Sequence, residues 1–410
     1  MHVLTLVPKF PNLVQTYIVS TLVGLKTLGI KTTIVAKVGD KSSSLPPAII
    51  NNKLLLDTIY IYTEGFSLFK SFLGLPFYKI KYLRSVKRLF KSNILHDFGL
   101  KYFIKSLIHV KILTYEKIDI IHSHSFVTSY EYLFLKEVFS IPIVATFHGH
   151  IPQGVKPMSN KKIGAIMSKV DIYFVNTPFS KQQLLELGCL GEIIKIIPQG
   201  TDLNYFPYHE RFISPDKAIR ILTVGRLSIE KGHATAIRAI ALLADKFPMI
   251  EYHIAGSGPE RENLTSLVLD LQMQDKIFFH GFVTSEDLKN LYATAHIFIL
   301  PSIDLHDGFH VETQGVVLQE AQACGLAAIA SRTGGIPYII KDNETGLLFD
   351  EGDASNLAEK IKTLIENPAI YSKTCLLGRQ DVETRFDINV ICNKLVASYS
   401  DCISHTSKHI

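Results

Sequence analysis

Residues 220–245, RILTVGRLSIEKGHATAIRAIALLAD, indicate the fold class of this 410-residue chain. They begin with a short apolar run, Arg220–Val224, which predicts a buried strand. A polar loop follows, and Gly232–Asp245 then carries apolar residues at helical spacing. A strand that leads through a short loop into a helix is typical of a βαβ unit, so the stretch predicts an α/β domain with a parallel sheet.

The same alternation of short apolar runs and longer amphipathic segments continues in both halves of the chain. The strand candidates of the first half are Val3–Val7, Thr32–Ala36, Ile118–His122, Pro142–Thr146 and Ile172–Asn176. Those of the second half are Arg220–Val224, Glu251–Ala255, Lys276–His280, His296–Leu300, Ala327–Ala330 and Gly346–Phe349. Because the strands recur in two sets, we predict two doubly wound domains, 1–198 and 199–380, with the boundary in the proline- and glycine-containing segment 198–215.

The composition is that of a globular protein, with 47% hydrophobic and 20% charged residues, which excludes a disordered or fibrous chain. No stretch reaches about 18 consecutive apolar residues, the length that a membrane-spanning helix needs. The N-terminus reads as a first strand, because it has neither a basic region nor a small-residue cleavage site. Five scattered cysteines without a CxxC pair favour reduced thiols and a cytoplasmic location.

Charge is divided unevenly, because residues 1–200 carry 24 Lys+Arg against 11 Asp+Glu whereas the remainder carries 19 against 27. Eleven of the basic residues lie in 66–117, interleaved with aromatics and opposed only by Asp97 and Glu116. This pattern favours a surface that meets an anionic membrane. The alternatives are a solvated basic face with its aromatics in the core, and a nucleic-acid site, for which no motif is present.

The stretch Glu312–Gly325 carries two glutamates eight residues apart in a segment that reads as a loop running into a helix at Gly315. Glu312 then precedes the helix and Glu320 lies inside it, and both carboxylates are able to accept hydrogen bonds from sugar hydroxyls. The free N–H groups of a helix N-terminus favour an anion such as a diphosphate. Two glutamates at this spacing are also common on ordinary helical faces.

Arg226 and Lys231 follow the strand candidate Arg220–Val224 and precede a helix. Both are expected at the carboxyl end of the sheet, which is where open parallel sheets bind ligands. A guanidinium and an ammonium at this edge would neutralise the charge that develops on a departing diphosphate. Taken alone, the pair is better explained as two exposed charges.

In combination, these motifs resemble glycosyltransferase family 4, the retaining nucleotide-sugar transferases of GT-B fold. The matching motifs are Gly225-Arg226-Leu227 with Glu230-Lys231-Gly232, Gly256–Pro259, Phe279–Val283, Ala295–Ser302, Glu312 with Glu320, Gly334–Pro337 and Glu344–Gly346. Weaker matches in the first half are Phe10–Ile18, Thr146–Gly149 and Pro198–Asp202. The resemblance implies two Rossmann-like domains that face each other across a cleft, with residues 381–410 as a C-terminal helix and tail that cross back to the N-terminal domain.

The resemblance also implies a role for each matching residue on the donor side. Arg226 and Lys231 would bind the donor diphosphate, Glu312 the transferred sugar and Glu320 the ribose hydroxyls. Further donor contacts would come from Phe282 and Val283 near the base, and from the Gly315 and Val316 amides at a phosphate.

On the other side, His148 would face the transferred sugar, and Gln15 and Thr16 would lie on the acceptor side. Gln15 stands where the family usually has glutamate, Gln199 replaces the usual asparagine, and Tyr338 takes a position that is commonly acidic.

Two motifs suggest other chemistry. His122-x-His124 and His148-x-His150 are able to point to one face of a strand, but a catalytic zinc site usually needs three protein ligands, and no HExxH or cysteine cluster is present. Gly256-Ser257-Gly258-Pro259 is a fragment of a dinucleotide fingerprint without its third glycine. We therefore expect no metal and no cofactor.

The resemblance implies a retaining hexosyltransferase of exopolysaccharide or lipopolysaccharide type. Such an enzyme is expected to move a sugar from a nucleoside diphosphate to a glycan or lipid-linked glycan, with contact at the cytoplasmic membrane face and without nucleic-acid partners. The alternatives are a sugar-nucleotide epimerase of similar fold and a non-catalytic accessory subunit.

Overall fold

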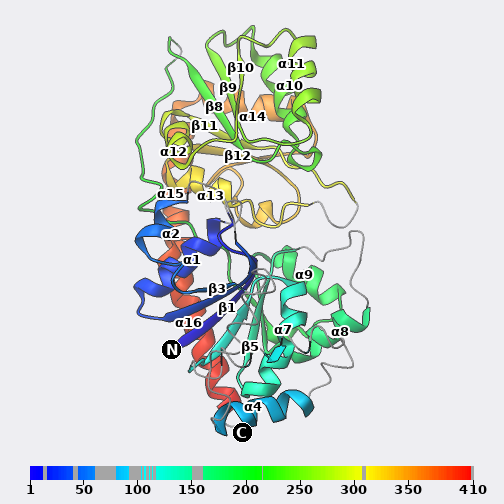
Figure 1. Cartoon of the computed structure of the whole chain (residues 1–410). Coiled ribbons are helices and arrows are strands. Elements are labelled where there is room, and N and C mark those ends of the chain that lie inside the picture. Colours follow the sequence, from blue (N-terminus) through cyan, green and yellow to red (C-terminus); the bar gives the residue numbers. More distant parts are fainter. Residues whose placement is uncertain are drawn as a thin grey trace. The chain divides into compact units, whose positions relative to one another are not determined.

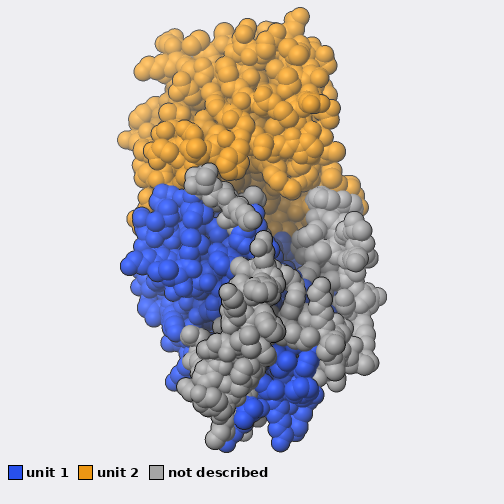
Figure 2. Space-filling model, in the orientation of Figure 1, with its two compact units in different colours: residues 1–175, 180–197, 392–410 blue, residues 176–179, 198–391 orange. Residues whose placement is uncertain are grey.

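The structure is a computed structural model that describes residues 1–12, 16–39, 45–60, 80–91, 103, 106–107, 110, 113, 117–149, 160–214, 216–306 and 311–407. Unit 1 comprises residues 1–175, 180–197 and 392–410, and unit 2 comprises residues 176–179 and 198–391; Figure 2 shows the two units in different colours. The chain therefore passes between the units four times, at 175/176 and 179/180 on either side of the segment 176–179, at 197/198 and at 391/392.

Unit 1 contains a parallel sheet with the strand order β3-β2-β1-β4-β5-β6-β7. The strands are β1 His2–Lys9, β2 Lys31–Val38, β3 Thr58–Tyr60, β4 Ile120–Ser123, β5 Ile143–Phe147, β6 Ile172–Val175 and β7 Ile194–Ile196. All five strands predicted in the first half are confirmed within two residues of their expected bounds. The prediction missed β3 and β7, because each is a three-residue strand at an edge of the sheet and too short to show a period.

Helices cover both faces of this sheet (Figure 1). They are α1 Thr16–Thr27, α2 Pro47–Asn51, α4 Ile80–Lys91, α7 Phe126–Phe139, α8 Asn160–Lys169 and α9 Pro178–Glu186, with a 3-10 turn η1 at Gly191–Ile193. α7 packs against α4 and α8 on one side of the sheet. On the other side, the Cys392 thiol of the C-terminal helix reaches the Thr21 carbonyl of α1 at 3.7 Å.

Unit 2 contains a second parallel sheet, with the strand order β10-β9-β8-β11-β12-β13. The strands are β8 Ile219–Val224, β9 Ile250–Ala255, β10 Ile277–Gly281, β11 Ile297–Leu300, β12 Ala327–Ser331 and β13 Leu347–Phe349. All six predicted strands are confirmed within one residue.

The strands β11 and β12 of unit 2 are apolar at successive positions because both of their faces are buried. Ile297 and Ile299 of β11 belong to one apolar cluster, and Phe298 and Leu300 belong to another. The helices are α10 His233–Leu243, α11 Arg261–Asp270, α12 Ser285–Thr294, α13 Val316–Ala323, α14 Ala354–Glu366 and α15 Pro368–Arg385, with 3-10 turns η2 Ile229–Lys231 and η3 Ile336–Tyr338. α10 packs with α11 and α14 in the first cluster, whereas α12 and α13 contribute to the second.

A half-buried arginine fixes the segment 208–214 to the rest of unit 2. The Arg211 guanidinium donates hydrogen bonds to four backbone carbonyls, three at the end of α12 (Tyr292, Ala293 and Ala295) and one at Cys324 after α13. A helix C-terminus carries unpaired carbonyls and a partial negative charge, so a cation satisfies both.

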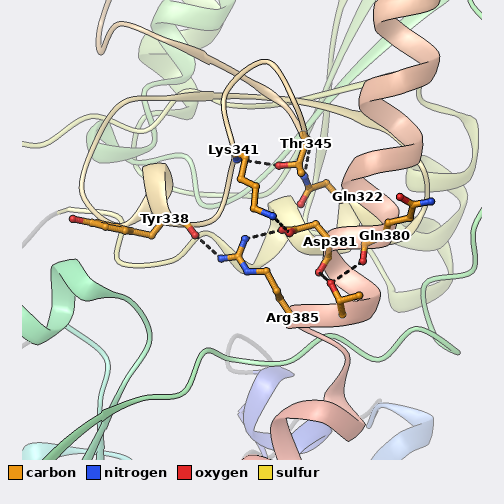
Figure 3. Close-up of polar contacts among 8 residues, drawn as sticks. Gln322, Tyr338, Lys341, Thr345, Gln380, Asp381 and Arg385 are labelled. Atoms are coloured by element: carbon orange, nitrogen blue, oxygen red, sulfur yellow. Dashed lines mark hydrogen bonds and ion pairs between the residues drawn. The ribbon is translucent and has the colours of Figure 1, made fainter.

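A buried carboxylate joins α15 to the loop after β12. Asp381 accepts hydrogen bonds from Lys341 Nζ and Arg385 Nη1, each at 2.8 Å, and Arg385 also donates to the Tyr338 carbonyl at 2.7 Å (Figure 3). In the same view, the Gln322 side chain of α13 donates to the Thr345 carbonyl at 2.7 Å. These contacts hold the loop that carries Gly334 and Gly335 against α13 and α15.

The last helix, α16 Ile388–Ser407, begins in unit 2, and its residues from 392 onward belong to unit 1. Tyr399 Oη shares a 2.7 Å hydrogen bond with His122 Nδ1 at the end of β4. The predicted α/β class with two doubly wound sheets and a C-terminal helix that crosses back is therefore confirmed.

No helix in the described part of the chain is both long and apolar enough to cross a bilayer. All five cysteines are free and buried. Of the basic segment 66–117, the structure describes 80–91, 103, 106–107, 110, 113 and 117, and the remaining positions lie outside the described residues.

Candidate functional site

The loop Glu312–Gly315 leads into α13 as predicted. Gly315 has a φ of +79°, and a Cβ at this position would lie 2.8 Å from Leu300 Cδ2, so both the backbone and the space require glycine. The Gly315 N–H donates to Glu312 Oε1 at 3.1 Å. Glu312 therefore lies directly at the N-terminus of α13.

Glu312 forms an ion pair with Lys231, whose Nζ lies 2.7 Å from Glu312 Oε2. Both side chains are mostly buried. Burial favours a higher pKa for the Glu312 carboxyl, but the Lys231 charge and backbone N–H donors outweigh it and lower the pKa. Glu312 is consequently a carboxylate at neutral pH, with one oxygen on an ammonium and the other on the helix N-terminus.

Two glycines shape the backbone around this pair. Gly232, directly after Lys231, has a φ of +63°, and a Cβ here would lie 1.8 Å from the Pro301 carbonyl oxygen. Gly335 donates its N–H to the Glu312 carbonyl at 2.8 Å, and a Cβ on it would lie 1.9 Å from the Thr313 carbonyl oxygen. The close approach of these backbones places the loops after β8, β11 and β12 at one edge of the sheet.

Arg226 is exposed, with 66% of its side chain accessible, and its Nη2 lies 2.9 Å from Glu230 Oε1. Ser228 Oγ donates to the same oxygen at 2.6 Å. Burial raises the pKa of Glu230, whereas Ser228, its own backbone and the charges of Arg226 and Lys231 lower it, and the lowering prevails. Arg226 therefore has a carboxylate partner that an anionic ligand would have to displace.

Glu320 lies inside α13 and is buried. Its Oε2 accepts a 2.9 Å hydrogen bond from the Tyr292 hydroxyl of α12. Burial raises the pKa of Glu320 to about 7, although the Tyr292 hydrogen bond lowers it in part. The protonation state of this carboxyl consequently changes around neutral pH.

Phe282 and Val283 follow β10, where Gly281 has a φ of +67°. Phe282 is 72% exposed. The Gly256 N–H after β9 donates to the Gly281 carbonyl at 2.8 Å, so the carboxyl ends of β9 and β10 are tied together. An exposed aromatic ring at this edge is available for stacking on a ligand.

The remaining candidates belong to unit 1. His148 follows β5, and its ring centroid lies 5.0 Å from that of Tyr17 and 6.0 Å from that of His124. Burial lowers the pKa of His148 to about 4, so its imidazole is neutral at pH 7. Thr16 is the exposed first residue of α1, and Gln15 lies outside the described residues.

Both ring nitrogens of His122 are hydrogen-bonded to other side chains. His122 bonds to Tyr399 and, through Nε2, to Thr146 Oγ1 at 2.7 Å. Its pKa is lowered to about 3 by burial and by His148. Within the described ranges, no group of three or more His, Cys, Asp and Glu side chains is arranged to hold a metal ion.

Sequence reasoning missed two residues that contact the site. Tyr292 gives no signal because it reads as one more apolar position of α12. Gln314 lies between the two motif positions Glu312 and Gly315, but its side chain bonds to the backbone of Gln199, 115 positions away. Neither partnership follows from local spacing.

Two family models match the chain in succession. Residues 14–205 match the model described as "Glycosyltransferase Family 4", and residues 207–375 match "Glycosyl transferases group 1". One relative is the amylovoran biosynthesis glycosyltransferase AmsK of Erwinia amylovora, 33% identical over 215 residues, which are 52% of this chain and 52% of AmsK. The chain spans 52% to 64% of the length of the first four curated relatives.

Solved structures show the same fold over nearly the whole chain. Anabaena Alr3699/HepE in complex with UDP has a TM-score of 0.72 at 17% identity, covering 98% of this chain and 100% of the Anabaena chain. Sucrose-phosphate synthase of Thermosynechococcus elongatus has a TM-score of 0.72 at 19% identity, covering 99% and 100%. With its two parallel sheets and the two consecutive family matches, this chain belongs to glycosyltransferase family 4 and has the GT-B fold.

Proposed function

We propose that the chain is a retaining glycosyltransferase that moves a sugar from a nucleoside-diphosphate donor to a glycan or lipid-linked glycan during cell-surface polysaccharide synthesis. The observation that carries the proposal is the contact of Glu312 with both Lys231 and the N-terminus of α13. The names of relatives support it, since AmsK is an amylovoran biosynthesis glycosyltransferase and HepE was solved with UDP.

The donor diphosphate would lie at Lys231, Arg226 and the first amides of α13, those of Gly315 and Val316. Negative charge develops on the leaving phosphate as the bond to the sugar breaks, and two cations beside a helix N-terminus stabilise that charge. Arg226 would exchange Glu230 for the phosphate. We expect no metal, because these groups supply the positive charge.

Glu312 would accept hydrogen bonds from the transferred sugar, and Glu320 would accept them from the ribose. Glu312 is already held by Lys231 and Gly315, which suits a positioning carboxylate rather than a nucleophile. We therefore infer attack by the acceptor on the face that the phosphate leaves, with His148 facing the sugar, Phe282 and Val283 facing the base, and Gln15 and Thr16 on the acceptor side.

A thermal-shift panel tests the donor site. The melting temperature is measured with UDP, GDP, ADP and CDP for the native protein, for Arg226→Ala and for Arg238→Ala, an exposed arginine of α10 that serves as control. At about 100 times its dissociation constant, a ligand stabilises by about 2.7 kcal/mol. A shift with one nucleotide that is lost in Arg226→Ala alone supports the proposal, and no shift with any of the four contradicts it.

The retaining stereochemistry is tested separately, by nuclear magnetic resonance of the product formed from a donor of known anomeric configuration. The same configuration in product and donor supports same-face attack. An inverted product contradicts it.

We further propose that α4 contacts an anionic membrane at the cytoplasmic face. Its twelve residues hold five Lys or Arg and no acidic residue. Leu83 and Phe90 are 55% and 64% exposed and lie at i and i+7, on a face away from the buried Ser85 and Leu89. An apolar stripe flanked by cations is suited to the surface of acidic lipids.

Co-sedimentation with phosphatidylglycerol vesicles at low salt tests this contact. The double variant Leu83→Ser/Phe90→Ser should lose vesicle binding, whereas Leu190→Ser, which removes an equally exposed leucine near α9, should retain it. Equal binding of all three proteins would argue against α4 as the docking element.

A further inference from the structure

Gln314 is a buried glutamine whose side-chain amide forms two hydrogen bonds with the backbone of a single residue, Gln199. Its Oε1 accepts from the Gln199 N–H at 2.9 Å, and its Nε2 donates to the Gln199 carbonyl at 2.9 Å. The side chain is 1% exposed. Gln314 therefore clamps Gln199 from within the loop Glu312–Gly315, called here the donor loop because we propose that it binds the donor diphosphate.

Gln199 lies directly after the point at which the chain passes from unit 1 into unit 2, at 197/198. The next contacts extend the connection to the passage at 391/392. Thr201 N–H donates to the Phe386 carbonyl at 2.8 Å, and Ile388 N–H donates to the Thr201 carbonyl at 3.0 Å. Gly200 has no room for a side chain, since a Cβ would lie 3.0 Å from Ile388 Cα.

The segment 176–179, where the chain enters and leaves unit 2, also contacts the donor loop. Thr177 Oγ1 donates to the Thr313 carbonyl at 3.0 Å. Within unit 2, Thr313 thus bonds to the segment 176–179 and Gln314 bonds to the segment 198–201. The segment 386–388, which precedes the passage at 391/392, bonds to Thr201. Thr313 and Gln314 lie directly between Glu312 and Gly315, which form the proposed donor site.

We propose that Gln314 is a positioning residue that fixes the donor loop to the crossing segment 198–201, so that Glu312 and the Gly315 amide hold their places only while the Gln199 clamp is formed. The inference rests on the proposed function, because it assumes that a nucleoside diphosphate binds at this loop. Loop residues that bind ligands need such support, because a short loop without side-chain anchors samples several conformations.

The test uses the whole chain with three substitutions. Gln314→Met keeps the length and packing of the side chain and removes both hydrogen bonds. Gln314→Glu keeps the acceptor for the Gln199 N–H but sets a carboxylate against the Gln199 carbonyl. Gln322→Ala is the matched control, since it removes a buried glutamine of α13 that also bonds to a carbonyl, that of Thr345, away from the crossing segments (Figure 3).

The first measurement is hydrogen–deuterium exchange of the unliganded proteins in peptides that contain Gly315. We expect faster exchange of the Gly315 amide in Gln314→Met and in Gln314→Glu at pH 8, and unchanged exchange in Gln322→Ala. Unchanged exchange at Gly315 in Gln314→Met overturns the inference, whatever the ligand of this site is.

The second measurement is the dissociation constant for whichever of UDP, GDP, ADP and CDP the native protein binds. We expect about a tenfold weaker affinity in Gln314→Met, the size that loss of one or two neutral hydrogen bonds gives, and less than a twofold change in Gln322→Ala. Native-like affinity in Gln314→Met overturns the inference but leaves the proposed function intact. A native protein that binds none of the four nucleotides overturns both.

Protonation should rescue Gln314→Glu, because a carboxylic acid donates to the Gln199 carbonyl as the amide does. The affinity of this variant relative to the native protein should therefore recover between pH 8 and pH 5. Glu320 titrates in this pH range in both proteins, so the ratio removes its contribution. A ratio that is independent of pH overturns the clamp.

Discussion

The hydroxyl of Tyr292 donates a 2.9 Å hydrogen bond to Oε2 of Glu320, and this joins α12 to the carboxylate that we assign to the ribose. Both groups are buried. Burial raises the pKa of Glu320 to about 7, and the Tyr292 hydrogen bond lowers it in part and so increases the ionised fraction of this carboxyl at neutral pH.

Tyr292→Phe should raise the pKa of Glu320 further and weaken nucleotide binding at pH 7 by about three- to tenfold, because a protonated carboxyl accepts fewer hydrogen bonds from the ribose. Affinity measured from pH 6 to pH 9 should show the midpoint of the variant displaced to higher pH. Superimposable pH profiles of the two proteins would contradict the assignment.

Glu320→Gln should stabilise the unliganded protein at pH 8. The pKa of Glu320 is raised on folding, so its neutral form is favoured in the folded state, and stability declines as the pH rises from about 4.5 through about 7. Removing the ionisable group should recover up to about 3 kcal/mol above pH 7, since one pKa unit corresponds to about 1.4 kcal/mol. Urea unfolding at pH 5 and pH 8 checks this, and the gain should fall to about 1 kcal/mol or less at the lower pH.

Lys231→Met should leave Glu312 buried without its cation and cost about 3 kcal/mol, the usual effect of removing one partner of a buried ion pair. The Glu312 pKa is lowered on folding, so the contribution of the pair is present at neutral pH and is lost as the pH falls through that pKa. The double variant Lys231→Met/Glu312→Gln should recover most of the loss in urea unfolding at pH 7. A double variant as unstable as the single one would show that the loss is due to packing.

Arg211→Met should lower stability by about 3 kcal/mol, because four partly buried carbonyls lose their donor at once. Arg220→Met is the control, since its guanidinium is 43% exposed and pairs with Glu251 at the surface. Thermal unfolding should show a decrease of several degrees for the first variant and about one degree or less for the second. Equal decreases would indicate that the buried donors contribute little.

Gly232→Ala should impair both folding and nucleotide binding, because its Cβ would lie 1.8 Å from the Pro301 carbonyl oxygen at a φ of +63°. Gly352→Ala is the matched control, with a φ of +74° and no atom within 4 Å of the new Cβ. The control should lose only the conformational contribution, about 1 kcal/mol. Similar unfolding curves for the two variants would show that the loop after β11 moves aside freely.

Much of the fold could be predicted from the sequence because strands buried on both faces are continuous apolar runs. Ile297–Leu300 and Ala327–Ser331 show this directly, and each was predicted within one residue. β3 and β7 could not be predicted, because three residues at a sheet edge show no period and take their place from one neighbouring strand.

The site divides in the same way. The local order Glu312, Gly315 and Glu320 already predicted a loop, a helix start and a carboxylate within the helix, since these depend on backbone geometry over a few residues. The ion pair between Lys231 and Glu312 could not be predicted from local sequence, because the two residues are 81 positions apart. They meet because β8 and β11 are neighbours in the sheet.

By itself, then, the sequence determined the two parallel sheets, the helix that starts at Gly315 and the types of charge at the edge of unit 2, because each depends on short-range periodicity and backbone preference. Only the tertiary structure decided that Gln314 bonds to Gln199, that Tyr292 holds Glu320 and that Arg211 caps α12. The physical reason is that a buried polar atom must find a partner where the packed chain provides one, and that position is set by the whole fold.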